Sequence, residues 1–251
     1  METEAGHPSE DEGALVVRAS DPEEVAGRLE ALDSVGGYRL EPGPTLRIRD
    51  RYVDTADGDL GARRIALRVR EVDGATLLTL KGSSRTTGHG THQRLEIEEP
   101  WSEPALARAM EELRTMGVPL EVRAGGATPV EALESVGLRV VQDRETERTV
   151  RHVLADGPAA ELAIDRVTYH LGEAAPRLLE VEVEAKRPGA SGVLHDVIDA
   201  LDHEWPELRR WPHSKLAIGK ALERLLREGR FRGELVTGKD LDRIAVELGD
   251  A

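Results

Sequence analysis

Charged and apolar residues alternate in five short segments of the sequence that are expected to be strands. The segments are IALRVR (65–70), LLTLK (77–81), QRLEIE (93–98), ELAID (161–165) and LEVEVE (179–184). Because side chains i and i+2 of a strand share a face, each strand has one apolar and one charged face. The early segments place Arg and Lys on the charged face, and the later ones place carboxylates there. Arg and Lys suit phosphate oxygens and carboxylates suit Mg²⁺ or Mn²⁺, so together they suit a polyphosphate with its metal.

Two arrangements of these strands are compatible with the alternation. In the first, an antiparallel sheet packs its apolar face on helices and presents its charged face to bulk water. In the second, the sheet closes into a barrel, and charges of both signs line a wet interior. A dry interior is excluded because burying an ion costs several kcal/mol even after relaxation. Repetition of the pattern in five segments favours the barrel, although the sequence leaves both arrangements open.

Turn and helix signals place these segments in an α+β fold. The expected fold class is an eight-stranded antiparallel β-barrel, or tunnel, with helices packed outside. Strands are expected at 14–19, 46–54, 65–72, 76–81, 92–98, 138–154, 160–168 and 178–186, and loops at 36–45 and 82–91. Helices are expected at 21–33, 103–116, 130–135, 193–203, 215–227 and 239–248. The domain organisation would be a disordered acidic tail at 1–12, one domain at 13–228 and a helical extension at 229–251.

Composition narrows the possible partners of the protein. The 251 residues carry a formal charge of −14, which argues against nucleic-acid binding. There are no cysteines, which excludes disulfides, thiolate metal sites and a cysteine nucleophile. The apolar runs are too short for a transmembrane helix, and the acidic N-terminus is unlike a secretory signal. A cytoplasmic protein without a membrane partner is therefore expected, and its oligomeric state is left open.

The order of the charged motifs resembles that of the CYTH family, also called the triphosphate tunnel metalloenzymes. The resemblance covers residues 12–226. It is carried by Asp54-Thr55, ALRVRE (66–71), TLLTLKG (76–82), RLEIEEP (94–100), an Arg-rich strand at 144–151, LAID (162–165), LLEVEVE (178–184) and HSKLAIGKAL (213–222). The resemblance implies an eight-stranded tunnel that binds a triphosphate or polyphosphate anion, with Mg²⁺ or Mn²⁺ as cofactor.

The resemblance also implies roles for individual residues. The implied phosphate-binding bases are Arg68, Arg70, Lys81, Arg94, Arg148 and Lys215. Glu180 and Glu182 are implied as metal ligands, and Glu184 shares their face. Supporting roles fall to Glu12, to the acidic pair Glu96 and Glu98, and to Asp165, which resembles an aspartate that orients a tunnel arginine.

The first strand departs from the family's E-x-E-x-K motif, whose glutamates bind metal and whose lysine helps to activate water. If Glu12 is the first glutamate, Ala14 and Val16 replace the second glutamate and the lysine. If Arg18 stands for the lysine, Ala14 and Val16 replace both glutamates. No residue is assigned as catalytic.

Four functions follow from this reading of the sequence. The first is a metal-dependent triphosphate hydrolase similar to inorganic triphosphatases. The second is a module that binds triphosphate or polyphosphate without turnover. A class IV adenylate cyclase is less supported, since aromatic residues that could stack on adenine make up only 3% of the chain. The fourth is a structural barrel without affinity for anions.

Overall fold

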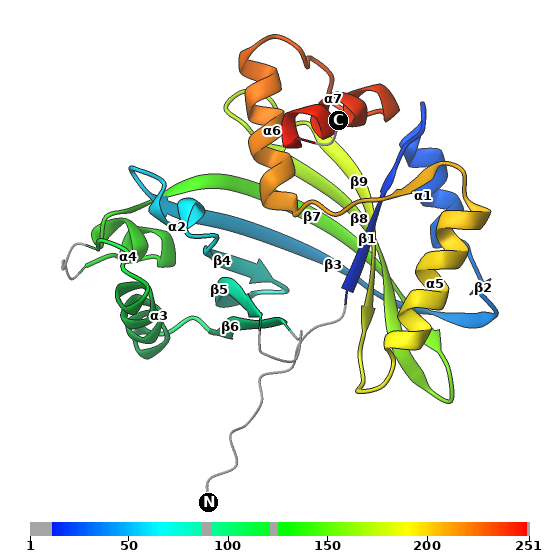
Figure 1. Ribbon diagram of the computed structural model, residues 1–251, viewed down its shortest axis with the longest axis horizontal. Helices are drawn as coiled ribbons and strands as arrows, with labels where there is room; N and C mark the ends of the chain where they lie inside the picture. The colour runs from blue at the N-terminus through cyan, green and yellow to red at the C-terminus, as the bar shows by residue number, and fades with distance from the viewer. Residues whose placement is uncertain (1–11, 87–91, 121–124, 250–251) are drawn as a thin grey trace, which may run out of the picture. The chain divides into compact units, whose positions relative to one another are not determined.

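The computed structural model describes residues 12–86, 92–120 and 125–249, without the side chains of 83–96. The strands are β1 (Glu12–Val17), β2 (Ser34–Val35), β3 (Tyr38–Thr55), β4 (Ala66–Val72), β5 (Ala75–Thr86), β6 (His92–Pro100), β7 (Leu138–Leu154), β8 (Pro158–His170), β9 (Arg177–Ala185) and β10 (Leu208–Arg210) (Figure 1). The helices are α1 (Pro22–Glu30), α2 (Asp59–Ala62), α3 (Glu103–Thr115), α4 (Pro129–Ser135), α5 (Ser191–Glu204), α6 (Lys215–Arg227) and α7 (Gly238–Leu248). Within the described ranges, no helix is long and apolar enough to cross a membrane.

The strands form one sheet in the order β10-β1-β9-β8-β7-β3-β4-β5-β6, with β2 paired to β3. The fold is therefore the expected α+β arrangement of an antiparallel sheet with helices. Its ten strands include eight of six or more residues, and the two additional strands, β2 and β10, are too short to be recognised from alternation. Among the described residues the order is a path with two ends, so hydrogen bonds do not close it into a ring.

The chain divides into two compact units. The first unit contains residues 49–143, and the second contains residues 12–48 and 144–249. The division passes through the two long strands β3 and β7, which each contribute to both units. Each unit therefore carries its own group of candidate site residues.

The second unit packs one face of β1, β9 and β8 against helices α1 and α5. Leu15, Leu162 and Val181 are fully buried in this core, together with Leu29 of α1 and Leu201 of α5. In α1, Asp21 caps the N-terminus by accepting a hydrogen bond from Glu24 N, which positions Val25, Ala26 and Leu29 toward the sheet. Because residues alternate along a strand, Glu180, Glu182 and Asp165 lie on the opposite face of the same strands.

A second apolar cluster of this unit anchors α6 and α7. Ser214 caps α6 by accepting a hydrogen bond from Ala217 N, and this cap makes Lys215 the first residue of the helix. Ile218 and Leu222 of α6 pack in the same cluster as Ile244 of α7. The cluster therefore fixes the start of α6, and with it the position of Lys215.

The first unit packs β4 and β5 against α3 and α4. Leu67, Leu80 and Leu113 are fully buried in this core. The expected hairpin turn is present, with Asp73 and Gly74 both at positive φ, as a type I′ turn requires. The opposite face of these strands carries Arg68, Arg70, Thr79 and Lys81.

Two predicted loops are strands in the structure. Residues 38–45 belong to β3, where a Cβ on Gly43 would lie 2.9 Å from Val150 Cγ1, so glycine allows β3 and β7 to approach closely here. Residues 82–86 belong to β5, and the β5–β6 register shifts between Lys81 and Ser84. The glycines and prolines from which loops were predicted thus lie where β3 and β7 approach closely and where the pairing of β5 with β6 is irregular. The rest of the second loop, and the predicted tail up to residue 11, lie outside the described residues.

Candidate functional site

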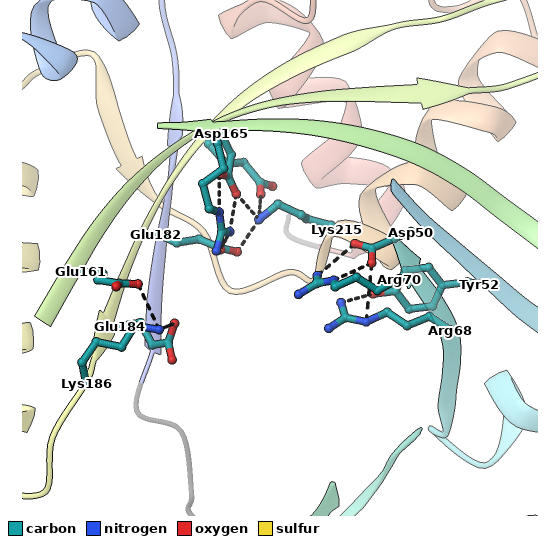
Figure 2. A network of polar contacts seen from close by, with 12 residues as sticks. Asp50, Tyr52, Arg68, Arg70, Glu161, Asp165, Glu182, Glu184, Lys186 and Lys215 are labelled. Carbon is teal, nitrogen blue, oxygen red and sulfur yellow. Dashed lines mark hydrogen bonds and ion pairs between the residues drawn. The ribbon is translucent and has the colours of Figure 1, made fainter. Parts of the chain in front are cut away.

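An aspartate and an arginine form the centre of the charged face in the second unit. Asp165 of β8 is completely buried. Arg148 of β7 donates from Nε to Asp165 Oδ1 at 2.8 Å and from Nη2 to Oδ2 at 2.6 Å (Figure 2). The same Nη2 also donates to Glu182 Oε2. Two carboxylates therefore hold one edge of the guanidinium in a fixed orientation.

Lys215 reaches the same carboxylates from the first turn of α6. Its Nζ lies 2.7 Å from Glu180 Oε2 and 3.2 Å from Asp165 Oδ2, and it donates to Glu182 Oε1 (Figure 2). Its side chain is 10% exposed. A cation at a helix N-terminus is opposed by the helix dipole, so this position depends on the three carboxylates.

The protonation states of this cluster follow from burial and pairing. Burial lowers the pKa of Lys215, but the charges of Glu180, Glu182 and Asp165 outweigh it and hold that pKa well above its usual value. Burial raises the pKa of Glu182, but Lys215 and Arg148 together hold it well below its usual range. Burial dominates at Glu180, whose pKa is raised. Lys215 is therefore a fixed cation and Glu182 a fixed anion near neutral pH.

The pairing register places the departure from the E-x-E-x-K motif directly beside this cluster. Ala14 of β1 lies opposite Glu182 of β9, and Val16 lies opposite Glu180. Val16 is completely buried in the apolar cluster that anchors α6 and α7. Arg18, the alternative to the motif lysine, pairs with Asp242 of α7 at 2.7 Å. The first strand thus brings neither a carboxylate nor an ammonium to Glu180 and Glu182.

Glu184 belongs to a separate group of the second unit. Lys186 donates to Glu184 Oε2 at 2.6 Å and lies 3.1 Å from Glu161 Oε2 (Figure 2). Glu12 is exposed and lies opposite Glu184 in the β1–β9 pairing. Although Glu184 shares a face with Glu182, it has a different cationic partner.

In the first unit, Asp50 of β3 orients Arg70 of β4. Asp50 is 1% exposed. It accepts hydrogen bonds from Arg70 Nε at 2.8 Å and from Arg70 Nη2 at 3.1 Å (Figure 2). This is the same two-bond contact, through Nε and Nη2, that Asp165 makes with Arg148 in the second unit.

Arg68 lies beside this pair. Its Nη1 donates to Tyr52 Oη at 3.2 Å, and its Nε lies 3.7 Å from Asp50 Oδ1 (Figure 2). Glu98 accepts from Thr79 Oγ1 at 2.8 Å and pairs with Arg68 at 3.4 Å. Burial raises the pKa of Glu98, but these partners hold it below its ordinary value.

The remaining predicted site residues of this unit are placed by strand register alone. Lys81 lies opposite Glu96 across β5 and β6, and Arg94 lies opposite Ser84 after the register shift. The side chains of Arg94 and Glu96 lie outside the described part of the chain.

The strands predicted from alternation therefore do not all present their charges to bulk water. Arg68, Asp165 and Glu180 are each less than a tenth exposed.

Sequence reasoning missed Asp50 and Tyr52, although they occupy alternate positions of a segment predicted to be a strand. Arg49 and Arg51 flank Asp50, so charged residues occupy three successive positions, and this obscured the alternation.

Within the described part of the chain, Asp165, Glu180 and Glu182 as they are paired here do not fit a divalent cation. Five of the six oxygens of Asp165, Glu180 and Glu182 already receive N–H groups from Lys215 or Arg148, and the exception, Glu180 Oε1, is buried without a hydrogen-bond partner among the described residues. Across the three described ranges, no group of three or more His, Asp or Glu residues is arranged to hold a metal ion. Mg²⁺ requires an octahedral oxygen shell, which one free oxygen does not provide.

Comparison with known proteins identifies the family of the chain. The family model of the CYTH domain matches residues 16–208. The chain belongs to the CYTH family. Its CYTH match begins at Val16, after the positions of Glu12 and Ala14.

Among curated proteins, the CYTH chain is 27% identical over 157 residues to the inorganic triphosphatase of Haemophilus influenzae. This match covers 62% of the chain but only 40% of that relative's length. Two solved structures share the fold at 18% identity. One is an adenylate cyclase candidate from Bacillus halodurans, with a TM-score of 0.53 over 84% of this chain and 96% of that one. The other is an adenylyl cyclase candidate from Hippeastrum described as having a dominant triphosphatase activity, with a TM-score of 0.51 over 90% and 99%.

Proposed function

We propose that this chain binds the triphosphate group of a small anion through its basic side chains. One observation carries the proposal: Arg70 and Arg148 are each locked by a buried aspartate through Nε and Nη2. In both residues Nη1 makes no hydrogen bond to the described part of the protein, and both side chains are about one fifth exposed, at 22% and 21%.

A guanidinium fixed in this way suits phosphate. Phosphate oxygens accept charge-assisted hydrogen bonds from N–H groups, and an arginine that is already oriented loses little side-chain entropy when it binds. Asp50 and Asp165 thus act as positioning residues. Arg68, Lys81, Arg94 and Lys215 are proposed to add positive charge, with Glu98 orienting Arg68.

The proposal is tested by calorimetric titration with inorganic tripolyphosphate, with orthophosphate and sulfate for comparison. Arg70→Met and Arg148→Met should each weaken tripolyphosphate binding by about tenfold or more, because each loses a charge-assisted hydrogen bond. Arg114→Met on α3 and Arg227→Met on α6 are matched controls, since both arginines are exposed at the surface. Wild-type affinity for tripolyphosphate in both site variants, or no binding by the wild type, would reject the proposal.

Hydrolysis of the bound triphosphate is the second candidate function. The curated relative named inorganic triphosphatase supports it, together with the Mg²⁺ or Mn²⁺ expected for the family. Ala14 and Val16, opposite Glu182 and Glu180, instead support binding without turnover. Release of phosphate from tripolyphosphate, measured with and without Mn²⁺, separates the two candidates, and formation of cyclic AMP from ATP would reveal a cyclase.

A further inference from the structure

The ammonium group of Lys215 lies among three carboxylates, where a metal ion would be expected from the family resemblance. Its contacts reach Asp165 on β8 and both Glu180 and Glu182 on β9. An ammonium group has three N–H donors, and three carboxylates surround this one. All donors of Lys215 are therefore satisfied by the residues that the family resemblance assigns to metal binding or to its support.

The first strand, β1, adds no further carboxylate to the group around Lys215. Ala14 and Val16 share the face of Glu182 and Glu180 but contribute no oxygen atom. Val16 packs in the cluster that contains Ile218 and Leu222 of α6. The apolar residue that replaces a motif position thus helps to hold the helix that delivers Lys215.

We propose that Lys215 replaces a divalent cation at Asp165, Glu180 and Glu182, so that this chain binds triphosphate without a metal ion. The inference rests on the proposed triphosphate binding. The ammonium, with Arg148, neutralises carboxylates that would otherwise repel an approaching polyanion. As part of the chain, it pays no translational entropy on binding, and a metal ion would have to displace it.

The first experiment measures tripolyphosphate binding by the wild-type protein in EDTA, together with binding of Mn²⁺ alone. The inference predicts that tripolyphosphate binds in EDTA and that Mn²⁺ alone does not bind. Binding of tripolyphosphate only in the presence of Mn²⁺ would overturn the inference and leave the proposed function intact. Absence of binding in both conditions would overturn the proposed function itself.

The second experiment removes the ammonium with Lys215→Met, and Lys220→Met on the exposed side of α6 serves as the matched control. Lys215→Met should weaken tripolyphosphate binding in EDTA by about tenfold or more, because the carboxylates lose their neutralising charge. It should also gain measurable Mn²⁺ binding, and added Mn²⁺ should restore much of the affinity for tripolyphosphate. Unchanged affinity in EDTA would contradict the inference. If Lys215→Met does not fold, the same binding measurements on Lys215→Gln, together with tripolyphosphate binding by the wild type in EDTA, test the inference.

Discussion

Ala14 of β1 lies directly opposite Glu182 of β9, on the face that carries the buried carboxylates. In an antiparallel pair, directly opposite side chains have Cβ atoms about 4.5–5.5 Å apart, so a carboxylate at position 14 would lie beside Glu182. That carboxylate is absent, and Glu182 accepts hydrogen bonds from Lys215 and Arg148 instead. Under the proposal that Lys215 replaces a metal ion, the side chains of β1 determine which cation Glu182 accepts.

Restoring the missing carboxylate should create affinity for metal. Ala14→Glu places an additional negative charge beside Glu182, so Mn²⁺ should raise the melting temperature of this variant measurably. Ala14→Gln has nearly the same shape without the charge and should show no such shift. Equal thermal shifts in the two variants would count against this placement of position 14.

Restoring a lysine at position 16 should destabilise the protein. Val16 is completely buried in the apolar cluster, and its neighbour Glu180 already pairs with Lys215, so Val16→Lys would bury a second ammonium or force α6 and α7 apart. We expect a loss of about 2–5 kcal/mol in the free energy of unfolding, measured by urea denaturation. Val246→Lys is the control, since Val246 is 63% exposed and should tolerate lysine. Similar losses at the two positions would contradict the burial of Val16.

Removing the charge of Asp165 should have a large effect on stability. Asp165→Asn keeps the shape of the side chain but leaves Arg148 and Lys215 short of a buried partner. Breaking one side of a buried ion pair costs about 3–5 kcal/mol. Asp199→Asn is the control, because Asp199 is 68% exposed and should change stability by less than about 1 kcal/mol. Chemical denaturation of both variants checks this, and a loss at Asp165 no larger than at Asp199 would refute it.

The lowered pKa of Glu182 gives its contribution to stability a defined pH dependence. Because the folded-state pKa lies below the unfolded value of about 4.3, Glu182 stabilises the protein above that pH. The contribution is lost as the pH falls through the folded-state pKa. The difference in unfolding free energy between wild type and Glu182→Gln should therefore shrink between pH 6 and pH 3. A difference that stayed constant or grew over this range would disprove the pairing.

The experiment compares wild type with Glu182→Gln, and does not use the stability of wild type alone, because the pKa of Glu180 is shifted in the opposite direction. Its raised pKa means that its charged form costs stability above the unfolded value, so total stability mixes both effects. Because Glu182 is itself one cause of the raised pKa of Glu180, the difference between wild type and Glu182→Gln reports the effect of Glu182 together with its influence on Glu180.

Much of the fold was predictable because strand alternation and helix caps are local properties. Lys215–Arg227 was predicted as a helix with its exact bounds, and 138–154 as strand. The short strands β2 and β10 were not predictable, since two or three residues carry no periodicity. Gly43 predicted a loop, but it lies in strand β3, where the absence of a side chain allows the strand to lie close to Val150.

Alternation by itself determined which residues share a face, including Glu180 with Glu182 and Arg68 with Arg70. The resemblance to the CYTH family, compared with the sequence, showed that the E-x-E-x-K motif is incomplete at Ala14 and Val16. Only the tertiary structure decided which charges meet, because register and helix docking bring together residues distant in sequence. Asp165 with Arg148, and Lys215 with Glu182, are contacts of this kind. The sequence thus supplied the charges, and packing decided that a lysine meets the carboxylates.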